Sequence, residues 1–311
     1  MLVLLSSSTR FRANPVLEVA RRSTPRLASK AKVLVQELCR LEAKDIKKQL
    51  HVNDALAKQY AQHLNQFQAK QPAPCCCLYD TPLYDAANMS DFDEDDCEWA
   101  NDHVRIFSGL YGFLRPFDEI QTLSLPVGLN TKLTNSKGPF LRNFWRDAID
   151  KEIEEALQKL PVPVIVNMAA DEDKQLLDRE KLPDGTRIVQ VDFKMPKKDD
   201  ASAAKGELLR WMLQNRCMTV EELLEFKGLD DEQATSYRLH KNQTSADSLV
   251  FEENRGDGGD GGWNRKFNEF GGSKTKFIKE MASRPDKWQR GEIKRALEKD
   301  VKGRKKNTQF Y

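Results

Sequence analysis

The sequence predicts an α+β fold, a mixed α/β arrangement in which helices flank a mixed β-sheet. Short apolar runs at residues 1–5 and 164–168 are typical of buried strands. Longer segments whose apolar residues recur at helical spacing, such as residues 28–41, lie between them. No strand–helix unit repeats at a fixed period, which excludes a barrel or an array of repeats.

The composition is that of a globular chain. Its 311 residues are 32% charged and 39% hydrophobic, which is enough to bury a sizeable core without disulfides. No apolar run approaches the roughly 20 residues that cross a bilayer. We therefore expect no membrane partner.

The N-terminus allows two interpretations. Residues 1–32 contain many Arg and Ser and few acids, a pattern seen in mitochondrial transit peptides. Residues 1–5, however, begin at once as a buried strand, and the polar turn 6–10 follows directly. Ser6 and Arg10 are candidate site residues, because functional groups collect where the strands of α/β proteins end.

Helices are predicted at residues 28–41 and 53–67, the second with Asn53 as its N-cap. The next apolar run, residues 75–79, contains three consecutive cysteines and predicts a short buried strand. The six cysteines form no C-x-x-C pair, so we expect buried free thiols, with a metal or redox site as the alternative.

Residues 107–118, FSGLYGFLRPFD, are predicted to form a tight hairpin between two helices. The acidic run 91–96 favours a helix start, and Gly109 would end that helix in the left-handed conformation. Pro116 fits the first turn of a second, short helix. A glycine turn before a helix N-terminus presents N–H groups to phosphate. The alternative is a plain helix cap packed on the core.

The second half of the chain alternates strands and helices. The helical pattern continues at 141–160 and 201–214, and Thr219 begins a capping box for a further helix. The strands predicted there are 122–129, 164–168, 187–193, 236–240 and 248–252.

Polar residues gather where the strand at 164–168 ends. Asn167, Asp171 and Glu172 lie at its carboxyl end, which is where ligands collect in an α/β sheet. In the helix predicted at residues 201–214, Lys205 and Arg210 are free to face a cleft. These five residues are therefore candidates for a cleft.

The common catalytic signatures are missing. G-x-S-x-G, the phosphate-binding P-loop, the dinucleotide G-x-G-x-x-G and H-E-x-x-H do not occur. The four histidines are scattered, and the run 91–96 lacks the glycine and the terminal glutamate of a calcium loop. We expect no metal site and no cofactor, and no catalytic residue is assigned.

The formal net charge of +2 is unevenly distributed. Residues 263–311 hold 15 Lys or Arg and 6 Asp or Glu, a net charge of +9, which leaves −7 for residues 1–262. We expect a globular domain over residues 1–254 and a glycine/aspartate linker with a basic tail over 255–311. Such a tail indicates a polyanion partner or a nuclear address, or else a solvated disordered segment.

Several local strings resemble the YaaA family of peroxide-stress proteins. The most specific is IFSGLYGFLRPFD at 106–118, and the others are NFW at 143–145, VNMAADE at 166–172, KG at 205–206 and LVF at 249–251. Their order and spacing match the family from residue 1 to about residue 254. Because the family's first strand begins where this chain begins, the resemblance counts against a cleaved transit peptide.

The resemblance implies a single compact mixed α/β domain with a positively charged cleft and a helix-hairpin-helix element that binds DNA without sequence preference. It also implies a cytoplasmic protein that limits iron-dependent oxidative damage. By their positions in the family pattern, the residues of the cleft are Asn167, Asp171, Glu172, Lys205 and Arg210. The DNA-binding or phosphate-binding hairpin comprises Ser108, Gly109, Leu110, Tyr111, Gly112 and Arg115.

The chain departs from the family pattern after the first strand, where Ser6 to Arg10 replace the family's Ser-Pro-Ala-Lys. Two functions follow from the sequence. The first is a DNA-binding stress protein that contacts phosphates through the hairpin and the tail. The second is an enzyme of unknown reaction whose polar residues converge at the strand ends. A purely structural polar network is the third possibility.

Overall fold

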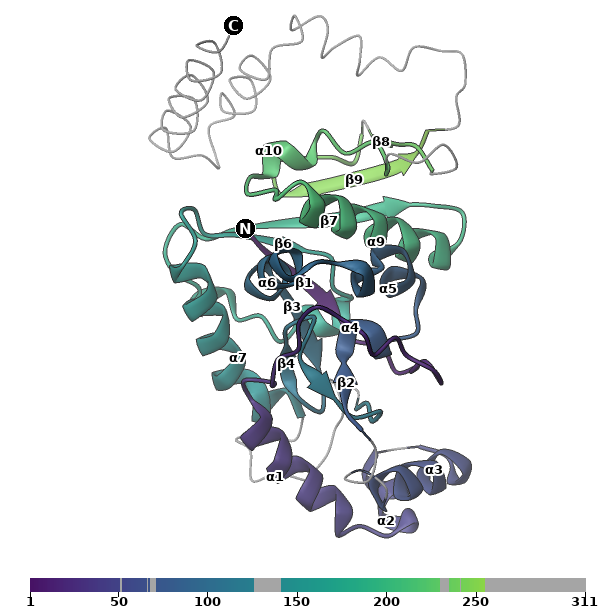
Figure 1. The fold of residues 1–311 in the computed structure, drawn as a ribbon. Helices are drawn as coiled ribbons and strands as arrows, with labels where there is room; N and C mark the ends of the chain where they lie inside the picture. Colours follow the sequence, from purple (N-terminus) through teal and green to yellow (C-terminus); the bar gives the residue numbers. More distant parts are fainter. Residues whose placement is uncertain are drawn as a thin grey trace, which may run out of the picture. The chain divides into compact units, whose positions relative to one another are not determined.

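The architecture is given by a computed structural model, which describes residues 1–50, 52–65, 67, 71–125, 141–229, 235–240 and 242–254 (Figure 1). The chain divides after Glu253, and Met1–Glu253 forms the first unit. The fold described below is that of the first unit.

A seven-stranded mixed sheet is the centre of this unit, with strand order β4-β3-β1-β6-β7-β9-β8. The five inner strands run parallel, and the edge strands β4 and β8 run antiparallel to their neighbours. The strands of the sheet are β1 (Leu2–Ser6), β3 (Val104–Ser108), β4 (Gly112–Leu114), β6 (Val164–Asn167), β7 (Arg187–Lys194), β8 (Tyr237–Leu239) and β9 (Ser248–Glu253). The predicted mixed α/β fold is thus confirmed.

The central strands β1 and β6 are apolar except for their last residues, Ser6 and Asn167, as expected of strands with both faces covered. Leu2 to Leu5 are each at most 1% exposed, and Val164, Ile165 and Val166 are also buried. A separate two-stranded antiparallel sheet joins β2 (Ala73–Pro74) to β5 (Glu119–Ile120). The strands predicted at residues 1–5 and 164–168 are confirmed.

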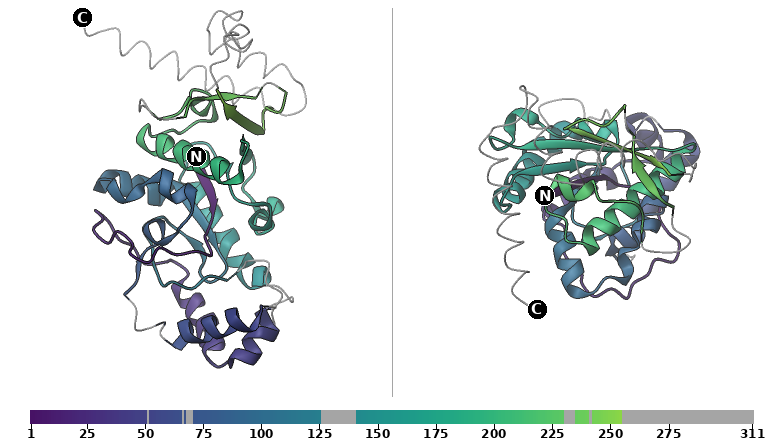
Figure 2. Two further views of the ribbon diagram at one scale, coloured as in Figure 1. Left: turned by 90° about the vertical axis from the view of Figure 1, so that its right-hand side faces the viewer. Right: turned by 90° about the horizontal axis from the view of Figure 1, so that it is seen from above.

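Helices pack on the sheet and extend beyond it. Helix α9 packs on β7, α5 lies against α9, and α6 contacts both α9 and β3, so these helices share one side of the sheet (Figures 1 and 2). Helices α1, α2 and α3 lie together below the sheet in Figure 1. The helices described are α1 (Ala28–Cys39), α2 (Ala43–Leu50), α3 (Asp54–Asn65), α4 (Cys75–Leu78), α5 (Pro82–Ala87), α6 (Glu94–His103), α7 (Leu141–Gln158), α8 (Asp171–Lys174), α9 (Lys198–Gln214), α10 (Val220–Leu223) and the 3₁₀ turns Met89–Asp91 and Arg179–Lys181.

Several predicted helix boundaries are confirmed by their caps. The side chain of Asn53 accepts a hydrogen bond from the Leu56 N–H at 2.9 Å, as expected of an N-cap. Thr219 and Glu222 form the complete capping box at the start of α10. Within the described ranges, none of the helices is long and apolar enough to cross a bilayer.

The predicted helix-hairpin-helix is wrong for residues 104–118. Helix α6 ends at His103, and the chain continues as β3, which pairs with β4 to form a β-hairpin. Residues 116–118 form a turn that leads into β5, so Pro116 begins no helix. The sequence predicts helix for residues 104–107 because Val104, Ile106 and Phe107 continue a mostly helical spacing from Trp99, and a short strand with Arg105 among them gives too short a pattern to distinguish.

Two further local predictions are wrong. Cys75–Leu78 is buried as expected but forms the short helix α4, which begins directly after Pro74. Residues 122–125 form no strand, and the remainder of the strand predicted at 122–129 lies outside the described residues. The described cysteines are free thiols, five of them buried and Cys39 exposed.

Candidate functional site

Parallel pairing brings the carboxyl ends of β1, β3, β6 and β7 to one edge of the sheet. The register pairs Ser6 with Phe107, Leu4 with Asn167, and Asn167 with Gln190. Ser6 and Asn167 therefore lie on neighbouring strands at this edge, as the sequence predicts. We call Ser6, Asn167, Asp173, Asp192 and Lys205 the strand-end cluster.

Ser6 connects β1 to the start of α8. Its Oγ accepts a hydrogen bond from the Ala170 N–H at 2.8 Å, and its hydroxyl donates to the Asp173 carboxylate. Its carbonyl oxygen accepts a hydrogen bond from the Tyr84 hydroxyl at 2.8 Å. Ser6 is thus held on three sides, with its hydroxyl directed at a carboxylate.

Asp173 is the carboxylate with the most altered acidity at this edge. Burial raises the pKa of Asp173 to about 6, the hydrogen bond from Ser6 lowers it, and the charge of Glu172 raises it further. A carboxyl group with a pKa near neutrality can both accept and return a proton.

Asn167 shapes the turn that follows β6. It is 2% exposed, and its Oδ1 accepts a hydrogen bond from the Ala169 N–H at 3.0 Å. The Met168 N–H donates to Leu4 O at 2.9 Å, which continues the pairing with β1 past the last residue of β6. Asn167 therefore positions the backbone of the turn that follows β6.

Lys205 reaches this edge from α9. Its Nζ donates to the Asp192 carboxylate at 2.8 Å and to Met168 O at 3.4 Å. The Lys205 side chain is 18% exposed, whereas the Asp192 side chain is 55% exposed. The ammonium group thus lies beside the β6–α8 turn. The pKa of Asp171 is lowered mainly by Lys174, and the charge of Lys205 lowers it further.

Other predicted residues at this edge are solvated. Asp171 is 95% exposed and pairs with Lys174 at 2.8 Å, a contact that lowers the pKa of Asp171. Glu172 and Arg10 are also exposed. The carboxyl group with the raised pKa at this edge is therefore Asp173, one or two residues beyond the carboxylates that the sequence indicates.

The contacts of Arg210 hold two helices together. Its guanidinium forms a bidentate pair with Asp91 at 2.9 and 3.0 Å and also donates to Ala87 O and Asn88 O. These contacts satisfy carbonyl groups at the end of α5. Arg210 thus fixes α5 against α9 and lies outside the strand-end cluster.

The β3–β4 hairpin turns inward. Its residues from Ser108 to Leu114 are all buried, with Leu110 at 0% exposed. The Trp145 Nε1–H donates to Gly109 O at 2.8 Å, and the Tyr111 N–H donates to Ser108 Oγ at 3.2 Å. The turn therefore presents no free row of N–H groups to a phosphate.

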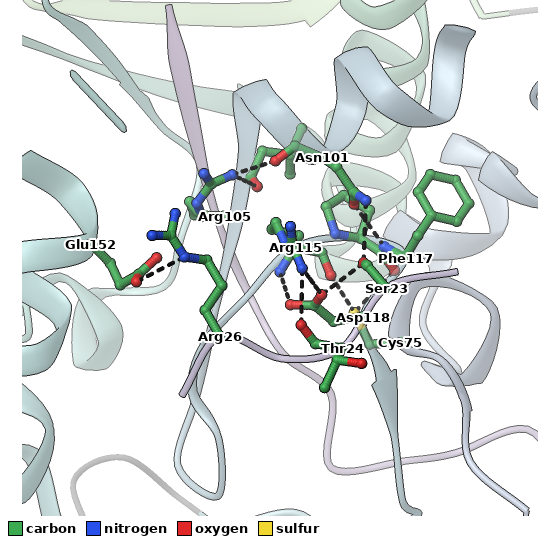
Figure 3. Close-up of polar contacts among 12 residues, drawn as sticks. Ser23, Thr24, Arg26, Cys75, Asn101, Arg105, Arg115, Phe117, Asp118 and Glu152 are labelled. Atoms are coloured by element: carbon green, nitrogen blue, oxygen red, sulfur yellow. Dashed lines mark hydrogen bonds and ion pairs between the residues drawn. The ribbon is translucent and has the colours of Figure 1, made fainter. Parts of the chain in front are cut away.

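Arg115 is held beside the buried carboxylate of Asp118 (Figure 3). Its Nε and Nη2 donate to Asp118 Oδ1 at 3.1 and 2.8 Å, its backbone N–H donates to Oδ2, and Nη2 also reaches Thr24 O at 2.9 Å. Ser23 donates to the same Oδ1 at 2.7 Å. Arg115 thus closes the loop between β4 and β5.

Sequence reasoning missed Asp173, Asp192 and Tyr84. The signal for Asp173 was its place in the first turn of a helix after a buried strand, where consecutive side chains point in different directions. Asp192 is the polar position of an alternating strand. In the part of the chain that the structure describes, no group of three or more His, Cys, Asp or Glu is placed to hold a metal ion.

The sequence matches the family of peroxide stress protein YaaA over residues 1–240. A UPF0246 protein of Caulobacter vibrioides is 31% identical over 262 residues, which cover 81% of this chain and 98% of that protein. A UPF0246 protein of Maricaulis maris is 29% identical over 260 residues, or 81% of this chain and 95% of that protein. One from Tolumonas auensis is 30% identical over 237 residues, or 73% and 90%. The chain therefore belongs to the family of peroxide stress protein YaaA.

Proposed function

We propose that this chain protects cells against peroxide through an enzymatic proton transfer at the strand-end cluster, acting on a small substrate with an anionic group. The observation that carries the proposal is the convergence of Ser6, Asp173 and Lys205 on one turn, held by the contacts of Ala170 and Met168. The family description supports protection against peroxide. The cytoplasm, implied by the family resemblance, is the proposed compartment.

The residues of the strand-end cluster have two roles, proton transfer and binding of an anionic group. Asp173, with a pKa of about 6, accepts or returns a proton near neutral pH, and the Ser6 hydroxyl donates to its ionised form. Lys205 supplies a positive charge that binds the anionic part of the substrate. Its partner Asp192 is 55% exposed and well solvated, so it neutralises that charge only in part.

Two substitutions test this function in cells that contain no other member of the family. Asp173→Asn removes the proton-transfer group, and Lys205→Met removes the charge but keeps the length of the side chain. Loss of a general acid or base costs roughly 100-fold or more in rate. Survival after a peroxide challenge should therefore fall to that of cells without the protein.

The matched control is Lys174→Met, which removes a lysine of the same turn that pairs with the exposed Asp171. It should leave survival unchanged. If Asp173→Asn and Lys205→Met proteins accumulate normally and still protect, the strand-end cluster is not the working site.

A second candidate function is phosphate-directed binding to DNA. The charge distribution favours it, because residues 263–311 carry +9 while residues 1–262 carry −7. The buried hairpin does not support the contacts first expected there, so the basic segment is the proposed contact surface. Such binding is independent of sequence and weakens steeply with salt.

The test is duplex binding by the full chain and by a chain that ends at Glu253, over a series of salt concentrations. We expect the full chain to bind at low salt, with an affinity that falls linearly on a log–log plot. The shortened chain should not bind. Equal binding by both would remove the basic segment as the contact surface.

A further inference from the structure

Three arginines from different parts of the sequence meet at the edge of the sheet opposite to the strand-end cluster (Figure 3). Arg105 lies near the start of β3, and Arg115 directly follows β4. The pairing of Ile106 with Leu114 places both at the open end of the hairpin. Arg26 comes from the segment before α1 and reaches Glu152 of α7 with its Nε at 3.1 Å.

Arg105 is almost completely buried, at 5% exposed. Its Nη1 donates to Asn101 O at 2.6 Å and to Val104 O at 2.8 Å, which satisfies carbonyls at the end of α6. Its Nε is buried and has no hydrogen-bond partner. A buried unpaired donor is costly, so it marks a place where an acceptor is missing.

Each of the three guanidinium groups keeps unused donors. Within the described part of the chain, no hydrogen bond is made by Arg26 Nη1, by Arg115 Nη1 or by Arg105 Nη2. The side chains of Arg26 and Arg115 are 36% and 25% exposed. Arg26 and Arg115 are therefore accessible from the solvent, whereas Arg105 is buried.

The local charges favour a further anion. Three guanidinium groups face two buried carboxylates, Asp118 and Glu152. A third carboxylate, Glu155, contacts Arg26 at 2.6 Å and is shared with Lys151 at 3.8 Å. When Lys151 is counted, four basic groups lie against three carboxylates, an excess of one positive charge.

We infer that Arg26, Arg105 and Arg115 form a binding site for a small terminal phosphate, either inorganic phosphate or the phosphate of a monoester. The charges of Arg26 and Arg115 act on Arg105, and three guanidinium groups can together donate to the three terminal oxygens of such a group. A DNA phosphodiester offers only two free oxygens and one charge. The site lies at the other edge of the sheet from the strand-end cluster and does not depend on the proposed enzymatic function.

The test is isothermal titration of the full chain with inorganic phosphate and with ribose 5-phosphate, in a phosphate-free buffer. We expect saturable binding of both. Arg26→Gln should weaken binding roughly tenfold or more, since it removes a charged hydrogen bond. Arg40→Gln is the matched control, because Arg40 is an exposed arginine paired only with Glu37 at 3.2 Å, and it should leave binding unchanged.

Glu152→Gln gives a prediction of opposite sign. It removes the carboxylate charge that pairs with Arg26, so phosphate should bind several-fold more tightly. Circular dichroism checks that each variant is folded. The inference is overturned if neither the natural chain nor Glu152→Gln binds phosphate saturably, or if Arg26→Gln binds as the natural chain does. It is also overturned if duplex DNA displaces phosphate from the natural chain but not from Arg26→Gln, because the site would then take diesters.

Discussion

At the scale of single residues, the two neighbouring carboxylates of α8 differ because of their surroundings. Asp171 is solvated and paired with Lys174, so its pKa is lowered. Asp173 is turned towards Ser6, and burial raises its pKa to about 6. The same chemical group is thus an ordinary surface charge at one position and a carboxyl with a raised pKa two residues later.

The pKa of Asp173 predicts a pH-dependent stability. Because the folded-state pKa is raised from 3.8 to about 6, ionisation of Asp173 destabilises the fold as the pH rises through this range. In Asp173→Asn this loss disappears. The unfolding free energy of the variant minus that of the natural chain should therefore grow by about 2 kcal/mol as the pH rises from about 4.5 to about 7.5. Urea denaturation at several pH values measures it, and a constant difference would contradict the assignment.

Gly112 is required at the start of β4. It has a φ of +73°, and an added Cβ would lie 2.8 Å from Cδ2 of the buried Trp145. We expect Gly112→Ala to destabilise the chain by about 3 kcal/mol or more, through backbone strain and displacement of the indole. Gly185→Ala is the control, because Gly185 also has a positive φ of 79° but is exposed. It should cost about 1 kcal/mol. Equal losses in urea denaturation would show that the indole contact is unimportant.

At the scale of elements, the position of Lys205 depends on how closely α9 approaches α5. Gly206 is buried in α9, and a Cβ there would lie 2.9 Å from Ala86 Cβ and would overlap the Leu83 carbonyl oxygen. The missing side chain lets the two helices meet. Arg210 then ties α9 to the end of α5 through Ala87 O and Asn88 O.

Gly206→Ala tests this packing. Helix propensity alone predicts a gain of about 1 kcal/mol for the change in a helix interior. The overlap with α5 predicts instead a loss of about 2 kcal/mol and a reduced peroxide protection, because Lys205 moves with α9. Thermal denaturation and cell survival measure the two effects. A rise in stability would show that α5 and α9 can separate at no cost.

The elements differ in how well the sequence predicts them. The strand at Leu2–Ser6 and helix α3 with its Asn53 cap are predicted because local signals determine them. Strand β3 is not, since Val104, Ile106 and Phe107 also fit a helical spacing that begins at Trp99. The burial of Arg105 within this strand is set by tertiary contacts, which the local pattern does not contain.

At the scale of the whole molecule, the site depends on contacts between residues far apart in the sequence. That Ser6 and Asn167 lie at one edge follows from the general rule for parallel strands. The strand order, which places β1 between β3 and β6, and the pairing of Lys205 with Asp192 are set by tertiary packing. Single-sequence patterns do not contain that information, so the sequence identified the edge of the sheet but not its complete set of groups.

The most direct test of the central claim compares three proteins in one peroxide-survival assay: the full chain, its Lys205→Met variant, and a chain ending at Glu253. If proton transfer at the strand-end cluster is the function, the shortened chain protects as the full chain does, and Lys205→Met does not. Protection by Lys205→Met, together with loss of protection in the shortened chain, would contradict this claim and assign the function to the basic segment.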